Sequence, residues 1–110
     1  MDKRIDANPE CPKLNDIDTS LITDMSGLFK DEDTIEELDL SSWDMSNVKD
    51  MSWMFYNCEH LIKLNIAGWD TSNVTNINDI FYNCWRLDRL DLSNWDTSNV
   101  TDMTGVFANC

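Results

Sequence analysis

The repeat period of this chain is carried by WDTSNVT at residues 69–75, which has a close copy, WDMSNVK, at residues 43–49 and an identical copy at residues 95–101. The copies lie 26 residues apart, and each is followed by an apolar pattern that ends in Phe and then Asn-Cys. A fixed period of this length is typical of repeat proteins, in which neighbouring units bury a shared core. We therefore expect stacked repeats rather than a globular domain built around one site.

Four repeat units are expected from residue 14 to the end of the chain. Residues 1–13 are polar, contain both prolines and match no unit, so we expect them to form an N-terminal cap or lead-in. The first unit keeps the apolar positions of the others but lacks their Trp and their Asn, as a capping unit does. The expected repeat region is residues 14–110, with units at about 14–39, 40–65, 66–91 and, incompletely, 92–110.

A short helix is expected in each unit. In the third unit the apolar residues Val74, Ile77, Ile80 and Phe81 follow the spacing of one face of an α-helix. Asn83 can end this helix, because Asn tolerates the left-handed backbone that follows helix ends. The candidate N-caps are Asn47, Asn73 and Asn99. The expected helices lie near residues 24–30, 50–56, 76–82 and 102–108.

A short strand is expected after each Asn-Cys pair. There the apolar period changes to two, so Leu64 and Ile66 should point inward while their neighbours point outward. One strand and one helix per unit predict an α/β fold: a right-handed, leucine-rich-repeat-like solenoid of about four turns, with a short parallel sheet on one face and short α-helices on the other. The expected strands lie near residues 38–40, 64–66 and 90–92, with a weak first strand near Leu14.

The charge of the chain excludes some classes of partner. Its net charge is −13, from 21 acidic and 8 basic residues, so nucleic acid and anionic membrane surfaces would be repelled. No apolar run approaches the roughly 18 to 20 residues that span a bilayer, and the N-terminus lacks the apolar segment of a signal peptide. We expect no nucleic-acid partner, no direct membrane insertion and no signal peptide within this chain.

The cysteines do not predict a metal or redox site. Cys58, Cys84 and Cys110 recur at the repeat period without the close clustering that zinc and redox sites need. Stacked side chains would also point in parallel, which is unfavourable for a disulfide. We expect these three to be small buried core residues, as free Cys usually is. No cofactor and no metal are expected.

The acidic ladder Asp44, Asp70 and Asp96 has two interpretations. The carboxylates could hold calcium between neighbouring units, or each could accept hydrogen bonds from amides of the turn that follows it. We favour the turn interpretation, because the chain has no EF-hand loop, and we leave calcium open. No nucleophile, base and orienting group can be assembled around His60, the only histidine, so we expect no catalytic residue and no enzyme.

The repeat resembles a known family at the motif WDTSNVTDMxxxFxNCxxLxxLxL, over about residues 14–110. It is similar to the BspA-like leucine-rich repeats of bacterial surface proteins, including mycoplasma-type lipoprotein repeats of unknown function. Trp43, Trp69 and Trp95 stand where leucine-rich repeats usually have an inward Asn. The resemblance implies a surface or secreted location, with adhesion suggested for some members, and the motif has no catalytic residue to transfer.

Two candidate interaction surfaces lie where the repeat copies differ or point outward. Trp53 and Trp85 replace polar or small residues of the other copies, so they should face solvent and could contact a protein or a glycan. The other candidate is a mixed-charge surface on the expected sheet face. It comprises Lys63, Asn65, Arg89 and Asp91.

Two functions follow from these features. The first is a non-enzymatic protein-interaction module of a bacterial surface or secreted repeat protein, related to adhesion. The alternative is a structural spacer or a self-assembling array segment that associates end to end through its open ends. The alternative is motivated by the absence of the strand expected after Cys110, which would leave the strand near residues 90–92 at an open edge. We expect either a segment of a longer repeat array or association end to end.

Overall fold

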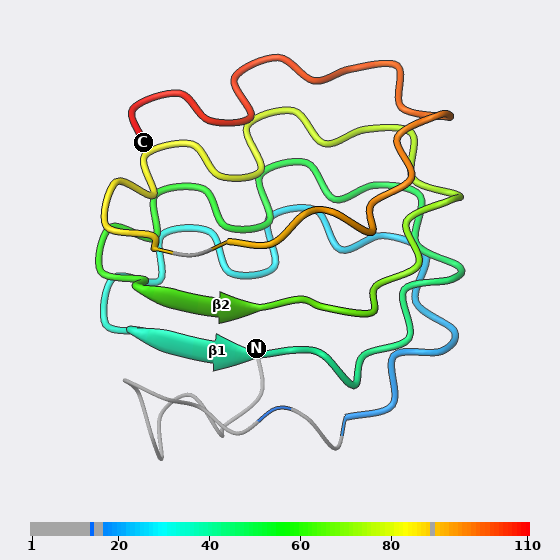
Figure 1. Ribbon diagram of the computed structural model, residues 1–110, viewed down its shortest axis with the longest axis horizontal. Coiled ribbons are helices and arrows are strands. Elements are labelled where there is room, and N and C mark those ends of the chain that lie inside the picture. Colours follow the sequence, from blue (N-terminus) through cyan, green and yellow to red (C-terminus); the bar gives the residue numbers. More distant parts are fainter. Residues whose placement is uncertain (1–13, 15–16, 89) are drawn as a thin grey trace.

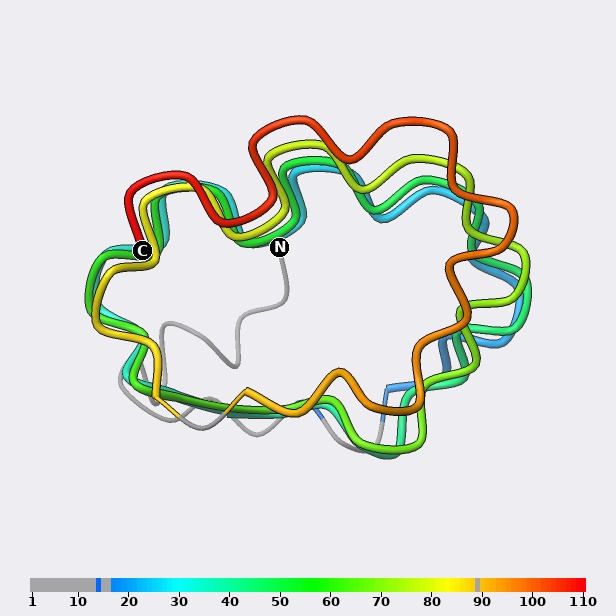
Figure 2. The ribbon, with the colours of Figure 1, turned by 45° about the horizontal axis from the view of Figure 1, so that its top comes forward.

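A computed structural model describes residues 14, 17–88 and 90–110, so the expected lead-in over residues 1–13 lies outside the described residues. Successive coils of the chain lie side by side (Figure 1) and follow almost the same path when viewed along the stack (Figure 2). Residues one repeat apart are therefore neighbours in space. The repeat period of the sequence is the distance along the chain between one coil and the next.

The strands of the described chain are β1, Glu37–Asp39, and β2, Lys63–Asn65. They pair in parallel, with Leu38 opposite Leu64. Both begin one residue earlier than expected, and their central Leu points inward while the flanking residues are exposed. Residues 90–92 are not in a strand, so the strand expected there is absent. The weak strand expected near Leu14 falls mostly outside the described residues.

The predicted α/β leucine-rich-repeat-like solenoid is wrong. The described residues contain no helix, and β1 and β2 are their only strands, so the coils carry no layer of helices opposite a sheet. The assignment to the leucine-rich repeat class fails with it. The four segments expected to be helical consist mainly of turns instead.

Hydrogen bonding explains why the helices do not form. In an α-helix each backbone N–H bonds to the carbonyl four residues earlier. Here Met54 donates to Met51, only three residues earlier, at 3.3 Å, and the next residue, Phe55, donates to Ile80 of the following coil at 2.9 Å. Alternation between turns within a coil and bonds between coils satisfies the backbone without a helix.

Left-handed backbone recurs in the same segments and also excludes a helix, because it interrupts the right-handed path. The expectation that Asn83 adopts this conformation is confirmed by a φ of 62°, although it lies in a turn rather than at a helix end. Asn57 and Asn109, at the same repeat position, have φ angles of 63° and 59°. A second set occupies one repeat position four residues earlier. It consists of Gly27, Trp53, Asp79 and Gly105.

The apolar pattern nevertheless identified inward-facing side chains. Turns run from Met45 to Val48 and from Met51 to Met54, and between them the Met51 N–H donates to Asn76 of the following coil. Val48, Met51 and Met54 are fully buried, as a helical face would also require. The Phe side chains of successive coils stack, with ring centroids 5.5 Å apart for Phe29 and Phe55. The spacing that predicted a helix therefore marks the core of stacked turns.

The WDTSNVT motif and its copies form a corner that joins neighbouring coils. The indole Nε1 of Trp69 donates to the carbonyl of Leu40 at 2.8 Å, and that of Trp43 donates to Leu14 at 2.8 Å. The predicted N-caps do not cap helices. Their side-chain amides donate to carbonyls of the preceding coil, as Asn73 does to Ser46 at 2.6 Å.

Candidate interaction surface

Trp53 is a large aromatic side chain on a strained backbone. Its φ is 61° and its side chain is 41% exposed, which agrees with the expectation that this position faces solvent. The residues at the same repeat position are Gly27, Asp79 and Gly105, which tolerate this backbone better than Trp does. Left-handed backbone at a bulky residue costs about 1–3 kcal/mol and concentrates at functional sites. Trp53 is therefore the strongest single candidate on this surface.

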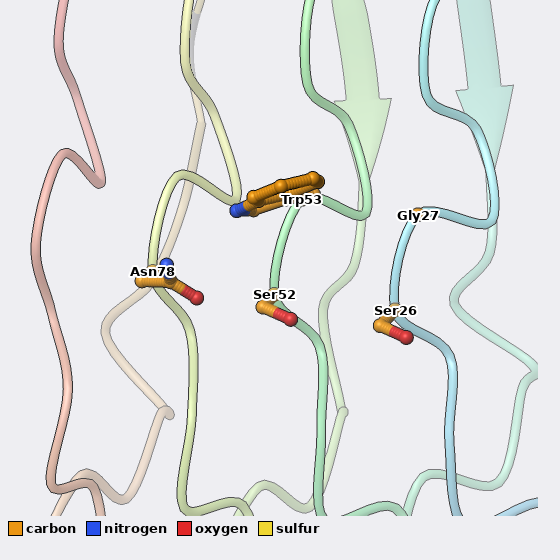
Figure 3. A pocket seen from close by; sticks show the side chains of 5 residues that line it. All are labelled: Ser26, Gly27, Ser52, Trp53 and Asn78. Atoms are coloured by element: carbon orange, nitrogen blue, oxygen red, sulfur yellow. The ribbon is translucent and has the colours of Figure 1, made fainter.

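A pocket of about 340 Å³ lies beside Trp53. Ser26, Ser52 and Asn78 form a row across three successive coils, and the Trp53 indole, seen edge-on, extends toward the coil of Asn78 (Figure 3). Gly27 completes the lining, and a Cβ added there would meet nothing nearer than Lys30 Cβ at 4.0 Å. The missing side chain at Gly27 thus helps to leave this space open.

An aromatic row runs beside the pocket. The rings of Trp53 and Tyr56 are 5.8 Å apart, and those of Tyr56 and Tyr82 stack at 4.8 Å. Lys30 Nζ lies 4.6 Å from the centroid of the Trp53 ring and 5.4 Å from that of Tyr56, which is cation–π geometry. Sequence reasoning missed Lys30, Tyr56 and Tyr82, although the two Tyr occupy the same repeat position and could have been found by alignment of the units.

Hydrogen bonds to the side chains of Asp50 and Asn76 hold two of the pocket residues in place. Ser52 donates through its N–H and its hydroxyl to Asp50 Oδ1, at 2.8 and 2.7 Å, and the Asn78 N–H donates to Asn76 Oδ1 at 2.9 Å. These are short turns in which a side chain accepts a hydrogen bond from the amide two residues later. The Ser52 oxygen keeps lone pairs for a ligand donor.

Trp85 does not belong to this pocket. Its side chain is 58% exposed, as expected, but it is not among the residues that line the space beside Trp53. The two candidate Trp therefore do not form one site.

The expected sheet-face surface is carried by β1 and β2, whose arrows lie behind the pocket residues in Figure 3. Lys63 forms an ion pair with Glu37 at 3.4 Å, and Asn65 Oδ1 accepts the N–H of Ala67 at 3.1 Å. Asp91 is exposed and accepts the N–H of Ser93 at 2.9 Å. Arg89 lies outside the described residues. Lys63, Asn65 and Asp91 are thus engaged locally.

The Asp ladder makes the turn hydrogen bonds expected of it. Asp70 accepts the N–H of Ser72 at 3.0 Å, and Asp44 and Asp96 accept from Ser46 and Ser98 in the same way. The side-chain and backbone hydrogen bonds from Ser72 lower the pKa of Asp70. Within the described residues, no group of three or more His, Cys, Asp or Glu side chains could hold a metal ion.

Two of the three repeat cysteines are buried, as expected. Cys58 and Cys84 are buried and free, whereas Cys110 is free but exposed. Each thiol bonds to a carbonyl 29 residues earlier, as Cys84 does to Phe55 at 2.9 Å. The neighbouring Cys84 side chain and burial raise the pKa of the Cys58 thiol. Cys58 is therefore a protonated core residue rather than a nucleophile.

The described residues contain no helix long and apolar enough to cross a membrane. A family model described as "Mycoplasma protein of unknown function, DUF285" matches residues 3–110. Comparison with curated proteins found no match, and comparison with solved structures found none. The family match agrees with the mycoplasma-type part of the expected resemblance, but it does not extend to BspA-like leucine-rich repeats.

Proposed function

This chain belongs to the family of Mycoplasma proteins of unknown function, and from that premise we propose that it is a non-enzymatic interaction module of a bacterial surface or secreted repeat protein. It binds a protein or glycan partner through the Trp53 pocket, and this binding serves adhesion. The observation that carries the proposal is an exposed Trp on strained backbone at the edge of an open pocket.

Backbone strain, residue type and net charge support the Trp53 pocket as the binding site. Gly27 and Gly105 make the same left-handed turn in two other repeat copies, so the turn does not require Trp, and the presence of Trp53 on this strained backbone points to a role that Gly cannot fill. Trp is also enriched among the residues that contribute most to binding energy, because it offers a large, rigid surface with a polar N–H. The net charge of −13 favours neutral or basic partners over nucleic acid and anionic membranes.

The test compares Trp53→Gly with Trp85→Ala as a matched loss of an exposed Trp. Both variants and the unaltered chain are passed over immobilised extracellular matrix proteins and host-cell surface glycoproteins, and binding is measured by surface plasmon resonance. We expect Trp53→Gly to weaken binding at least about tenfold and Trp85→Ala to leave it within about twofold. Equal binding by all three chains would contradict a role for the Trp53 pocket.

A second candidate function is supported by a separate observation at the last described coil. Phe107 is 53% exposed and Met103 is 49% exposed, whereas Phe55 and Phe81, which precede Phe107 in the same stack, are fully buried. Another coil laid on this face, from a second copy or from a continuation of the same chain, would cover both side chains. In this alternative the chain is a spacer or array segment that associates end to end, and sedimentation velocity at increasing concentration would show growing species that Phe107→Ser abolishes.

A further inference from the structure

We propose that the ligand of the Trp53 pocket is a neutral saccharide. This rests on the proposed function, and it names the ligand class. Ser26, Gly27, Ser52, Trp53 and Asn78 line the pocket, and none of them carries a charge. In a chain whose net charge is −13, an uncharged lining with one aromatic wall is a distinct chemical environment.

The lining complements the apolar face and the hydroxylated rim of a sugar ring. A pyranose carries C–H groups on one face, which pack against an indole, and hydroxyls around its rim, which both donate and accept hydrogen bonds. Trp53 offers the aromatic surface, the two Ser offer hydroxyl oxygens, and Asn78 offers an amide that donates and accepts. The volume of about 340 Å³ lies at the lower end of the range for small-molecule sites, which suits one or two sugar rings.

The pocket is held in place before a ligand arrives. The backbone N–H of Gly27 donates to Ser52 at 2.9 Å, and that of Trp53 donates to Asn78 at 3.0 Å, so the lining coils are tied directly to one another. Lys30 and Tyr56 pack against the Trp53 ring. A fixed aromatic wall loses little conformational entropy on binding, which favours affinity for a small ligand.

Charges around the pocket disfavour an acidic ligand. Asp24 and Asp50 lie next to it and accept hydrogen bonds from Ser26 and Ser52. The Lys30 ammonium lies over the Trp53 and Tyr56 rings, and Lys30 is not among the residues that line the pocket. Sialylated, sulfated or phosphorylated sugars would therefore be repelled, whereas a neutral sugar would not.

The experiment is calorimetric titration of the full chain with lactose, maltotriose, cellotriose and diacetylchitobiose, with sialyllactose as the charged partner of lactose. We expect at least one neutral sugar to bind, and if lactose binds, sialyllactose should bind at least about fivefold more weakly. Trp53→Gly should lose at least about tenfold in affinity and Asn78→Ala about threefold or more. Trp85→Ala is the matched control and should bind as the unaltered chain does.

A second experiment distinguishes failure of the saccharide proposal from failure of the interaction-module proposal. Glycoproteins that bind the chain are stripped of their glycans enzymatically and tested again against the same variants. Loss of Trp53-dependent binding on deglycosylation supports the saccharide. Trp53-dependent binding that survives deglycosylation overturns the saccharide but keeps the interaction module. Failure of the unaltered chain to bind any neutral sugar also overturns the inference, and binding indifferent to Trp53 overturns both proposals.

Discussion

At the scale of single residues, Trp53 combines an unusual backbone conformation with the binding role proposed above. Its repeat equivalents alone make it a candidate, because two of them are Gly and one is Asp. The reason those residues are small or polar lies in the left-handed backbone at this position, which a one-dimensional pattern does not show directly. A residue that departs from its repeat can therefore mark both strain and a site.

Replacement of Trp53 by Gly should leave stability within about 1 kcal/mol of the unaltered chain. Relief of left-handed strain, of order 1–3 kcal/mol, offsets the lost packing on Lys30 and Tyr56 and the greater flexibility of Gly when unfolded. Urea denaturation followed by circular dichroism measures this. A loss above about 3 kcal/mol would show that Trp53 is mainly structural.

The depressed pKa of Asp70 predicts a loss of stability in acid. Hydrogen bonds from Ser72 favour the carboxylate, so the folded pKa lies below the ordinary value of 3.8. Stability from this group is present above that value and is lost as pH falls through the folded pKa. We expect Asp70→Asn, which keeps an amide acceptor as Asn76 does, to flatten the dependence of urea midpoints on pH below about 4. An unchanged slope would contradict this account.

At the scale of elements, the repeated unit is a coil of turns tied to its neighbours rather than a strand and a helix. The apolar spacing correctly predicts the buried positions of the third unit, because the turns and a helix place similar residues inward, whereas Met103 and Phe107 of the last unit are about half exposed. The same spacing does not predict the hydrogen-bond partners, because bonds between coils join residues 25 positions apart, as between Phe55 and Ile80. Only the stacked arrangement supplies those partners.

Close contact between coils predicts a specific clash at Gly105. A Cβ there would overlap the Asp79 carboxylate, which would have to turn away, and the φ of 70° would strain any residue other than Gly. Gly105→Ala should therefore cost about 1–3 kcal/mol of unfolding free energy. The double variant with Asp79→Gly should recover the steric part and leave about 1 kcal/mol of backbone strain. Thermal or urea unfolding of the unaltered chain, the two single variants and the double variant measures the coupling energy between the two positions. Strictly additive changes in unfolding free energy would contradict the contact.

At the scale of the whole molecule, stability depends on stacks that run through all coils. Phe55 lies between Phe29 and Phe81, with centroids 5.5 and 5.7 Å away, and is fully buried, whereas Phe107 ends the stack. Phe55→Ala should cost about 3–5 kcal/mol, as buried Phe truncations do. Phe107→Ala is the matched control and should cost less than half of that. Equal losses measured by urea unfolding would argue against this stack.

The absence of helices in the described chain has a spectroscopic consequence. The far-ultraviolet circular dichroism spectrum should lack the double minimum of α-helix, although the apolar spacing alone predicts four helices. A spectrum with substantial helix that melts cooperatively would contradict the coil of turns. Aromatic bands from the stacked Tyr and Trp rings should melt together with the backbone signal.

From the amino-acid order one could read the 26-residue period, the buried positions of the third unit, and the exposure of Trp53 and Trp85. These features depend on side-chain chemistry repeated along the chain. The absence of helices from the described residues and the pocket shared by three coils depend on which carbonyl each N–H reaches and which side chains meet across coils. Such partners are 25 or more residues apart, so local spacing cannot distinguish a helix from stacked turns.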